Sequence, residues 1–180
     1  MEQLAYRSME KEDWDTFEKI VLSNSHAMKI AFDHLFKNIP NDRKYKLILG
    51  AYSWGGASKK NIQKAVKSLP KYGKPELPDD FDDVITVYRG CTGSAENAAS
   101  SFSWTTSLEA VKFFRRVHET GDGQAARIFR GKIRKEDIVA YITDLGQYEV
   151  IQFGKVFEVE DITDQVHDAI YEERRNEVSA

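Results

Sequence analysis

The spacing of hydrophobic positions changes near the middle of the chain, from helical periods in the first part to alternation in the second. Between residues 12 and 38, apolar side chains recur three, four or seven positions apart, which predicts an amphipathic helix. The polar run Ser23–Ser25 divides this predicted helix in two. Two further helices are expected, one over Arg43–Tyr52 and one capped by Ser58. The buried edge of the latter should comprise Ile62, Val66 and Leu69.

Alternation of apolar and polar residues dominates from Val84 onward. Two strand-like segments joined by a loop of small residues lie within Val84–Ser107, and a capping box at Thr106–Glu109 predicts a helix to about residue 119. Helices followed by strands, with one helix inserted, predict an α+β fold in a single domain. Further strands are expected at residues 126–133, 138–142, 149–153 and 156–162, and a short helix at 164–175. The predicted domain spans residues 1–180, with a helical part (1–80), a strand-rich part (81–163) and a tail (164–180).

The composition is that of an ordinary soluble globular protein, with 41% hydrophobic and 31% charged residues. The N-terminal sequence lacks the pattern of a signal peptide and no long apolar run is present, so a cytoplasmic location is expected. The single cysteine, Cys91, cannot form an internal disulfide, and the four scattered histidines fit no metal-binding motif. No glycine-rich phosphate loop or dinucleotide fingerprint is present, which argues against an NTPase or a Rossmann dehydrogenase.

Charge is unevenly distributed although the net charge is only −3. The segment Arg43–Lys74 contains nine basic residues and no acidic one. Such a segment can attract an acidic partner or nucleic acid, or it can form solvated helix faces that nearby acidic segments neutralise. The basic residues are Arg43, Lys44, Lys46, Lys59, Lys60, Lys64, Lys67, Lys71 and Lys74.

Candidate chemistry gathers at the ends of the predicted strands. Alternation places Arg89 at the end of the first strand and puts Ser103, Thr105 and Ser107 on one face of the second. A guanidinium facing hydroxyl groups suits a phosphorylated ligand, because arginine matches phosphate oxygens and hydroxyls donate to phosphate or ribose. Glu149 begins a later apolar strand, where a carboxylate is also compatible with a simple edge residue.

Three segments in this order, VYRG at residues 87–90, WTTSLEAVKFF at 104–114 and GQYEVIQ at 146–152, resemble the ADP-ribosyltransferase family of the Arg–Ser–Glu type. The similarity covers about residues 84–163 and is greatest to small bacteriophage members. It implies a mainly antiparallel split β-sandwich around an NAD cleft, flanked by helices. The implied activity is NAD-dependent mono-ADP-ribosylation of a macromolecular acceptor, with release of nicotinamide and no need for a metal.

The resemblance also implies roles for individual residues. Arg89 would hold NAD through its phosphates and ribose, and Gly90 would let the backbone approach the nicotinamide amide. Glu149 would bond the ribose 2′-hydroxyl and stabilise the oxocarbenium ion formed as nicotinamide leaves. The family's hydroxyl triplet aligns with Thr105, Thr106 and Ser107. Thr105 is the preferred functional hydroxyl, because it keeps the family's distance to the following helix, and Ser103 is the alternative register.

Gln147 stands two residues before the glutamate, where the family presents its acceptor. A glutamine there is found in members that modify asparagine, which weighs against arginine as the modified residue. The acceptor is expected to be a host protein, for a phage or toxin effector acting in the host cytoplasm, reached through the basic segment 43–74. An NAD glycohydrolase, or a catalytically silent inhibitor or binding protein, remains an alternative.

Overall fold

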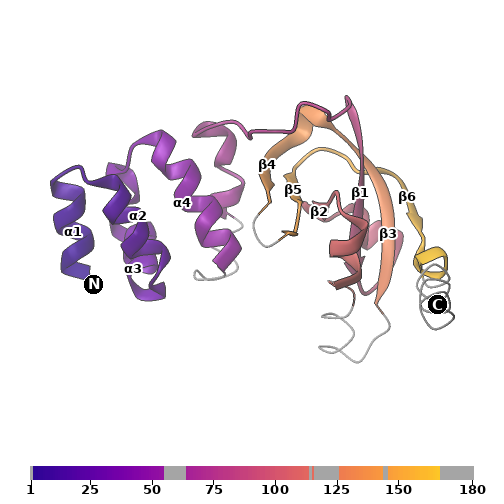
Figure 1. Cartoon of the computed structure of the whole chain (residues 1–180), viewed down its shortest axis with the longest axis horizontal. Helices are drawn as coiled ribbons and strands as arrows, with labels where there is room; N and C mark the ends of the chain where they lie inside the picture. The colour runs from indigo at the N-terminus through magenta and orange to yellow at the C-terminus, as the bar shows by residue number, and fades with distance from the viewer. Residues whose placement is uncertain (1, 55–63, 114, 116–125, 144–145, 167–180) are drawn as a thin grey trace, which may run out of the picture. The chain divides into compact units, whose positions relative to one another are not determined.

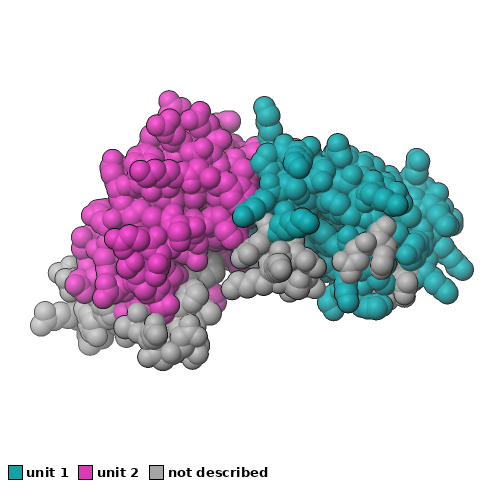
Figure 2. All heavy atoms as spheres, turned by 180° about the vertical axis from the view of Figure 1, so that it is seen from behind, with its two compact units in different colours: residues 1–74 teal, residues 75–180 magenta. Residues whose placement is uncertain are grey.

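The computed structural model describes residues 2–54, 64–113, 115, 126–143 and 146–166, and Figure 1 follows the chain through them. The chain divides into two compact units, residues 1–74 and residues 75–180, which Figure 2 colours separately. The boundary falls in the loop that Pro70, Pro75 and Pro78 mark, close to the change in composition predicted near residue 80.

Unit 1 is helical, and its first helix was not predicted. The helical region begins at residue 2 rather than near residue 12, because α1 precedes the predicted stripe and buries Ala5. The elements are α1 (Glu2–Glu10), α2 (Trp14–Leu22), α3 (Ser25–Ile30), a π-helical turn (Ala31–Leu35), a 3-10 turn (Phe36–Asn38), α4 (Asn41–Trp54) and a second 3-10 turn (Leu69–Lys71).

Side-chain caps divide the helices of unit 1 where the sequence predicts an interruption. Helix α2 ends at Leu22, and the side chain of Asn24 accepts a hydrogen bond of 2.9 Å from the amide of Ala27 to begin α3. Asp13 caps α2 in the same way, accepting from the amide of Thr16 at 3.2 Å. The predicted break at residues 23–25 is confirmed.

A compact apolar core holds unit 1 together. Phe17 and Val21 from α2 pack with Met28 from α3 and Leu47 from α4, and all four are buried. Farther along, Val66 and Leu69 are buried as predicted, while Ser58 and Ile62 lie outside the described residues.

The described residues of unit 2 form a six-stranded antiparallel sheet, which confirms the α+β class. The order across the sheet is β4-β5-β2-β1-β3-β6, so β4 and β6 form its edges (Figure 1). The strands are β1 (Val84–Cys91), β2 (Ser103–Thr105), β3 (Arg127–Arg134), β4 (Ile138–Ile142), β5 (Glu149–Gln152) and β6 (Phe157–Asp161). All six agree with predicted strands to within a few residues.

Among the described connections of unit 2, the loop after β1 differs from the prediction. The small-residue loop after β1 contains a short helix, α6 (Ala95–Ala99), capped by Ser94. Residues 108–113 and 163–166 are helical, in agreement with two predicted helices whose remaining parts lie mostly outside the described residues. No helix of the described ranges is long and apolar enough to cross a membrane.

Apolar side chains cover both faces of the sheet. One face buries Val87, Trp104 and Val150 in a single cluster. On the other face Val111, from the helix at residues 108–113, packs with Ile128 of β3. The central strands are therefore fixed from both sides, and the ends of β1, β2 and β5 have defined positions.

Candidate active site

Three strands bring Arg89, Ser103 and Glu149 together in unit 2. Strand β2 lies between β1 and β5, and its last residue, Thr105, pairs with Tyr88 of β1 and with Glu149 of β5. Residues far apart in the sequence therefore meet at adjacent positions on neighbouring strands. This arrangement follows from the strand order and not from any local motif.

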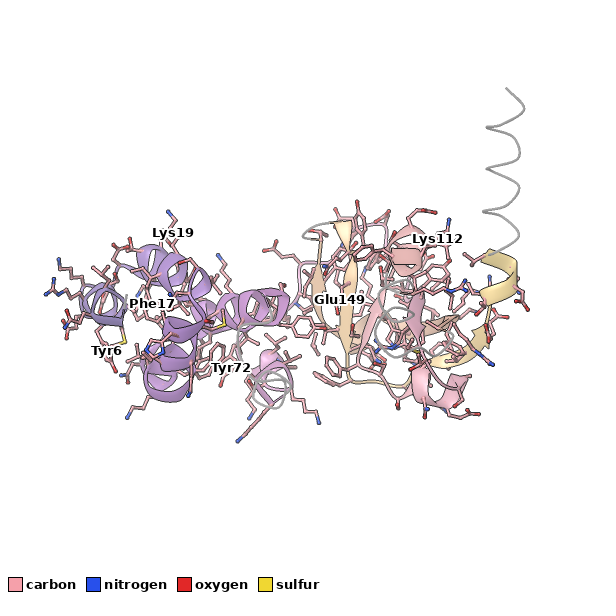
Figure 3. All side chains as sticks on the ribbon, turned by 90° about the horizontal axis from the view of Figure 1, so that it is seen from below. Tyr6, Phe17, Lys19, Tyr72, Lys112 and Glu149 are labelled. Atoms are coloured by element: carbon pink, nitrogen blue, oxygen red, sulfur yellow. The ribbon has the colours of Figure 1, made fainter. Side chains whose placement is uncertain are left out.

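Glu149 is buried and held by a serine. Its side chain is 9% exposed, and the Ser103 hydroxyl donates a hydrogen bond to Oε1. Ser103 is the diagonal neighbour of Glu149 across the β2–β5 pair, a separation that these side chains can bridge. Figure 3 labels Glu149 on β5, within unit 2. The carboxylate has a fixed orientation, because one oxygen is tied to the adjacent strand.

The side chain of Arg89 contacts the main chain of the same serine. The guanidinium Nη1 donates to the carbonyl oxygen of Ser103, whose hydroxyl donates to Glu149, so Arg89 and Glu149 are both bonded to this serine, at different groups. Arg89 also lies near Cys91. Burial raises the pKa of the Cys91 thiol, and the positive charge of Arg89 opposes that shift. Cys91 belongs to the apolar cluster on one face of the sheet, where it fills space.

Thr105, the preferred hydroxyl of the sequence analysis, has a different role. Its Oγ1 donates to the carbonyl of Gln147 at 2.6 Å and accepts from the amide of Ser107 at 3.0 Å. The side chain is 3% exposed. Thr105 therefore joins the end of β2 to the turn before β5, and the hydroxyl that contacts Glu149 belongs to Ser103. Of the two hydroxyls considered in the sequence analysis, Ser103 is therefore the one in hydrogen-bond contact with Glu149.

Thr106 and Ser107 also make structural contacts. The amide of Thr106 donates to the carbonyl of Tyr148 at 3.0 Å. The Ser107 hydroxyl accepts from the amide of Ala110 at 3.1 Å, so Ser107 caps the helix that follows. The predicted capping box between Thr106 and Glu109 is wrong in its first residue. Glu109 instead pairs with Lys112, at 2.5 Å.

A strained turn leads into Glu149. Tyr148 has a φ of 46°, in the left-handed region that residues other than glycine rarely adopt, and Gly146 has a φ of 68°. The bonds from Thr105 and Thr106 to this turn hold it in place. Tyr148 is 44% exposed, and the Gln147 side-chain amide makes no hydrogen bond to another described residue. Sequence reasoning missed this strain, although Gly146 marks a turn.

Gly90 lies under the helix that follows β2. A Cβ atom at Gly90 would be 2.8 Å from the amide nitrogen of Arg115 and 3.2 Å from the carbonyl oxygen of Val111. Backbone atoms cannot move aside cheaply, so close packing of this helix on β1 requires a glycine. This packing accounts for Gly90 without a ligand, whereas the resemblance implies that it gives access to nicotinamide.

A hollow of about 670 Å³ lies on the part of the sheet formed by β1, β3 and β6. Tyr88, Arg130 and Glu160 contribute to its lining, and neither Arg89 nor Glu149 does. Within the described residues there is no group of three or more histidine, cysteine or acidic side chains that could hold a metal ion.

The linked residues offer two chemical capabilities. A buried, oriented carboxylate can stabilise positive charge that develops on a bound molecule, and an adjacent guanidinium can pair with anionic oxygens. No protein-family model, curated protein or solved structure matches the chain.

Proposed function

We propose that the protein is an NAD-dependent mono-ADP-ribosyltransferase that acts on a macromolecular acceptor, expected to be a protein. The observation that carries this proposal is the linked arrangement of Arg89, Ser103 and Glu149 on three adjacent strands. An arginine, a serine and a glutamate in this chain order are the residues that the sequence resemblance requires. Their meeting at one site is independent support, because 46 residues separate Ser103 from Glu149.

In the proposed reaction the bond between the ribose C1′ of NAD and the nicotinamide nitrogen breaks, and its electron pair leaves with nicotinamide. Positive charge then develops on the ribose, where the Glu149 carboxylate would stabilise it. A nucleophilic group of the acceptor forms the new bond to C1′ and loses its proton. Ser103 would hold the carboxylate in position through both steps, while Arg89 would bind the phosphates.

The split β-sandwich of the resembling family is part of the same proposal. Strands β1 and β2 share one register pair, Tyr88 with Thr105, whereas β1 and β3 pair over eight residues. After Tyr88, β1 and β2 form no further register pair. The Arg89 side chain contacts the main chain of Ser103 there. Strands β4, β5 and β2 are thus joined to β1, β3 and β6 by one short pairing, that of β2 with β1. This short pairing supports the proposed cleft between the two groups of strands.

Gln147 and Tyr148 would face the acceptor. The amide of Gln147 cannot act as a base toward a guanidinium, but it can donate to and accept from another amide. Gln147 lies two residues before Glu149, in the turn that the Thr105 hydroxyl contacts. The expected acceptor group is therefore a side-chain amide, in keeping with the glutamine-containing members of the family.

The decisive experiment uses NAD labelled in its ADP-ribose part, incubated with a bacterial lysate. Label in precipitated macromolecules and released nicotinamide are measured for the wild type, Glu149→Gln and Glu96→Gln. Glu96 is an exposed acid of the same unit, so its variant controls for the loss of one negative charge. Glu149→Gln should lower turnover on the order of 100- to 1,000-fold and leave NAD affinity, measured by calorimetry, nearly unchanged.

The remaining outcomes separate the rival functions. Nicotinamide release without labelled macromolecules would identify water as the acceptor, and the protein would be an NAD glycohydrolase. No release by the wild type, together with retention of a lysate protein, would indicate a silent binding protein. Normal turnover in Glu149→Gln would remove this carboxylate from the mechanism.

A further inference from the structure

The two units carry opposite charges. Unit 1 contains 14 basic and eight acidic residues, a formal charge of +6, whereas unit 2 contains 12 basic and 21 acidic residues, a formal charge of −9. All nine basic residues of the segment 43–74 belong to unit 1. The excess positive charge of unit 1 therefore arises from its second half.

Four of these residues form what we call the lysine row: Lys64, Lys67, Lys71 and Lys74. All four are exposed, and they are spaced three, four and three residues apart. Val66 and Leu69, which are buried, alternate with the lysines, so the lysines lie on the outward side of this stretch. Residues 64–66 are helical and Leu69–Lys71 form a 3-10 turn, whereas Lys74 lies beyond both. Long side chains that end in nitrogen project outward near Tyr72 in Figure 3.

The lysine row is not neutralised by the described residues. Arg43, at the start of the basic segment, has acidic partners, since it pairs with Asp15 at 2.7 Å and with Glu18 at 3.3 Å. No ion pair within the described residues involves Lys64, Lys67, Lys71 or Lys74. Neighbouring like charges repel each other, and a polyanion that approaches the row would relieve this repulsion.

An aromatic contact fixes the end of the lysine row to the rest of unit 1. The Tyr72 ring meets the Phe36 ring edge to face at 5.8 Å, and the Lys44 ammonium lies 5.4 Å from the Tyr72 centroid. Tyr72 follows Lys71 directly, so this contact anchors the backbone that carries two of the four lysines. This end of the row is thus attached to a packed core.

We propose that the lysine row binds the phosphate backbone of nucleic acid without sequence preference. Successive phosphates of one strand are about 3.4 Å apart along a duplex, so a phosphate backbone presents closely spaced negative charges. Four exposed lysines within residues 64–74 can meet several of these phosphates, because lysine ammonium groups bind phosphate without a fixed geometry. Four neighbouring cations without acidic partners among the described residues favour a ligand with many adjacent negative charges, and a phosphate backbone supplies them at every position. This binding does not depend on the proposed transferase activity.

The test measures binding of the full chain to a fluorescently labelled 20-nucleotide single strand, and to the duplex of the same sequence, by anisotropy between 50 and 200 mM salt. Three proteins are compared. The row variant carries Lys64→Gln, Lys67→Gln, Lys71→Gln and Lys74→Gln. The control carries Lys11→Gln, Lys19→Gln, Lys29→Gln and Lys37→Gln, four exposed lysines of unit 1 outside the row.

The row variant should bind at least about tenfold more weakly at 50 mM salt. Its slope of log affinity against log salt should fall by about 3, because each phosphate contact contributes about 0.7 to 0.9. The control should change the slope by less than about 1. If the row variant binds both the single strand and the duplex more weakly, the row is supported as a phosphate site. If only one of the two is bound more weakly, that nucleic acid is the one that the row prefers.

Absence of binding by the wild type would overturn the proposal, and so would equal losses of affinity in the row variant and the control. It would also be overturned if polyglutamate displaced the labelled strand as effectively as unlabelled oligonucleotide at equal charge. The last result would identify an acidic protein as the partner. Glu149→Gln should bind the oligonucleotide like the wild type, so failure of this proposal and failure of the transferase proposal are distinguishable.

Discussion

The two units of the chain depend on contacts of very different range. In unit 1 the hydrogen bond that begins α3 joins residues three positions apart, Asn24 and Ala27. In unit 2 the hydrogen bond that orients Glu149 joins residues 46 positions apart. Local sequence signals therefore determine the helices of unit 1, whereas the candidate site of unit 2 exists only once the sheet has formed.

The difference extends to chemistry. Unit 2 combines a net negative charge with a buried carboxylate and a guanidinium that meet on one sheet. Unit 1 combines a net positive charge with exposed lysines on short helical elements. A surface of like charges requires only that lysines recur at short intervals in the sequence. The orientation of Glu149 requires the correct register between β2 and β5.

The largest expected effect is on the core of unit 1. Phe17 is fully buried among helices α2, α3 and α4, so Phe17→Ala should lower the free energy of unfolding by about 3–5 kcal/mol. If the two units are held by separate cores, hydrogen exchange should accelerate in residues 2–54 and change little in the strands of unit 2. Denaturant unfolding and exchange mass spectrometry measure the two quantities.

Leu4→Ala is the matched control for Phe17→Ala, because Leu4 is also apolar and lies in unit 1 but is 50% exposed. It should cost no more than about 0.5 kcal/mol. Equal loss of exchange protection in both units of Phe17→Ala would mean that they unfold as one.

An intermediate effect should separate the two hydroxyls of β2. Thr105→Val keeps the side-chain volume but leaves the carbonyl of Gln147 without its donor, and the expected loss of unfolding free energy is about 1–3 kcal/mol. Ser103→Ala should leave the fold nearly as stable and slow nicotinamide release instead, because Glu149 loses the group that orients it. Stability and turnover measured on both variants give the comparison.

The opposite pattern would contradict this division of roles. If Ser103→Ala turned over normally while Thr105→Val retained full stability and lost activity, Thr105 would be the functional hydroxyl. The family alignment preferred in the sequence analysis would then be correct.

Much of the fold could be predicted because its signals are local. Alternation identified all six strands, and β4 matches its predicted limits of Ile138 and Ile142. The polar run at residues 23–25 predicted the break between α2 and α3. Two helices were missed for local reasons as well: α1 lies before the recognised apolar stripe, and Ala95–Ala99 consists mostly of small residues that read as a loop.

The candidate site could be predicted only in part. The family resemblance singled out Arg89 and Glu149 at the ends of predicted strands, but alternation puts Ser103 and Thr105 on the same face and cannot choose between them. The choice depends on the pairing of β2 with β5, in which Thr105 lies opposite Glu149 and yet turns its hydroxyl to the preceding turn. A long-range register and a side-chain rotamer determine which hydroxyl contacts Glu149, and neither is encoded by nearby residues.

The smallest expected effect concerns the cap between α2 and α3, where the local character of unit 1 can be tested most directly. Asn24→Ala removes the acceptor for the amide of Ala27, which should lower the free energy of unfolding by about 1 kcal/mol. Asn24→Asp retains an acceptor in the same place and should keep most of the stability, with an added benefit from negative charge at the helix N-terminus. Thermal unfolding of the three proteins measures the difference. Because the contact spans three residues within unit 1, nicotinamide release should be the same in all three. A change in turnover with Asn24→Ala would show that the helical unit influences the candidate site, and the separation of the two units would then fail.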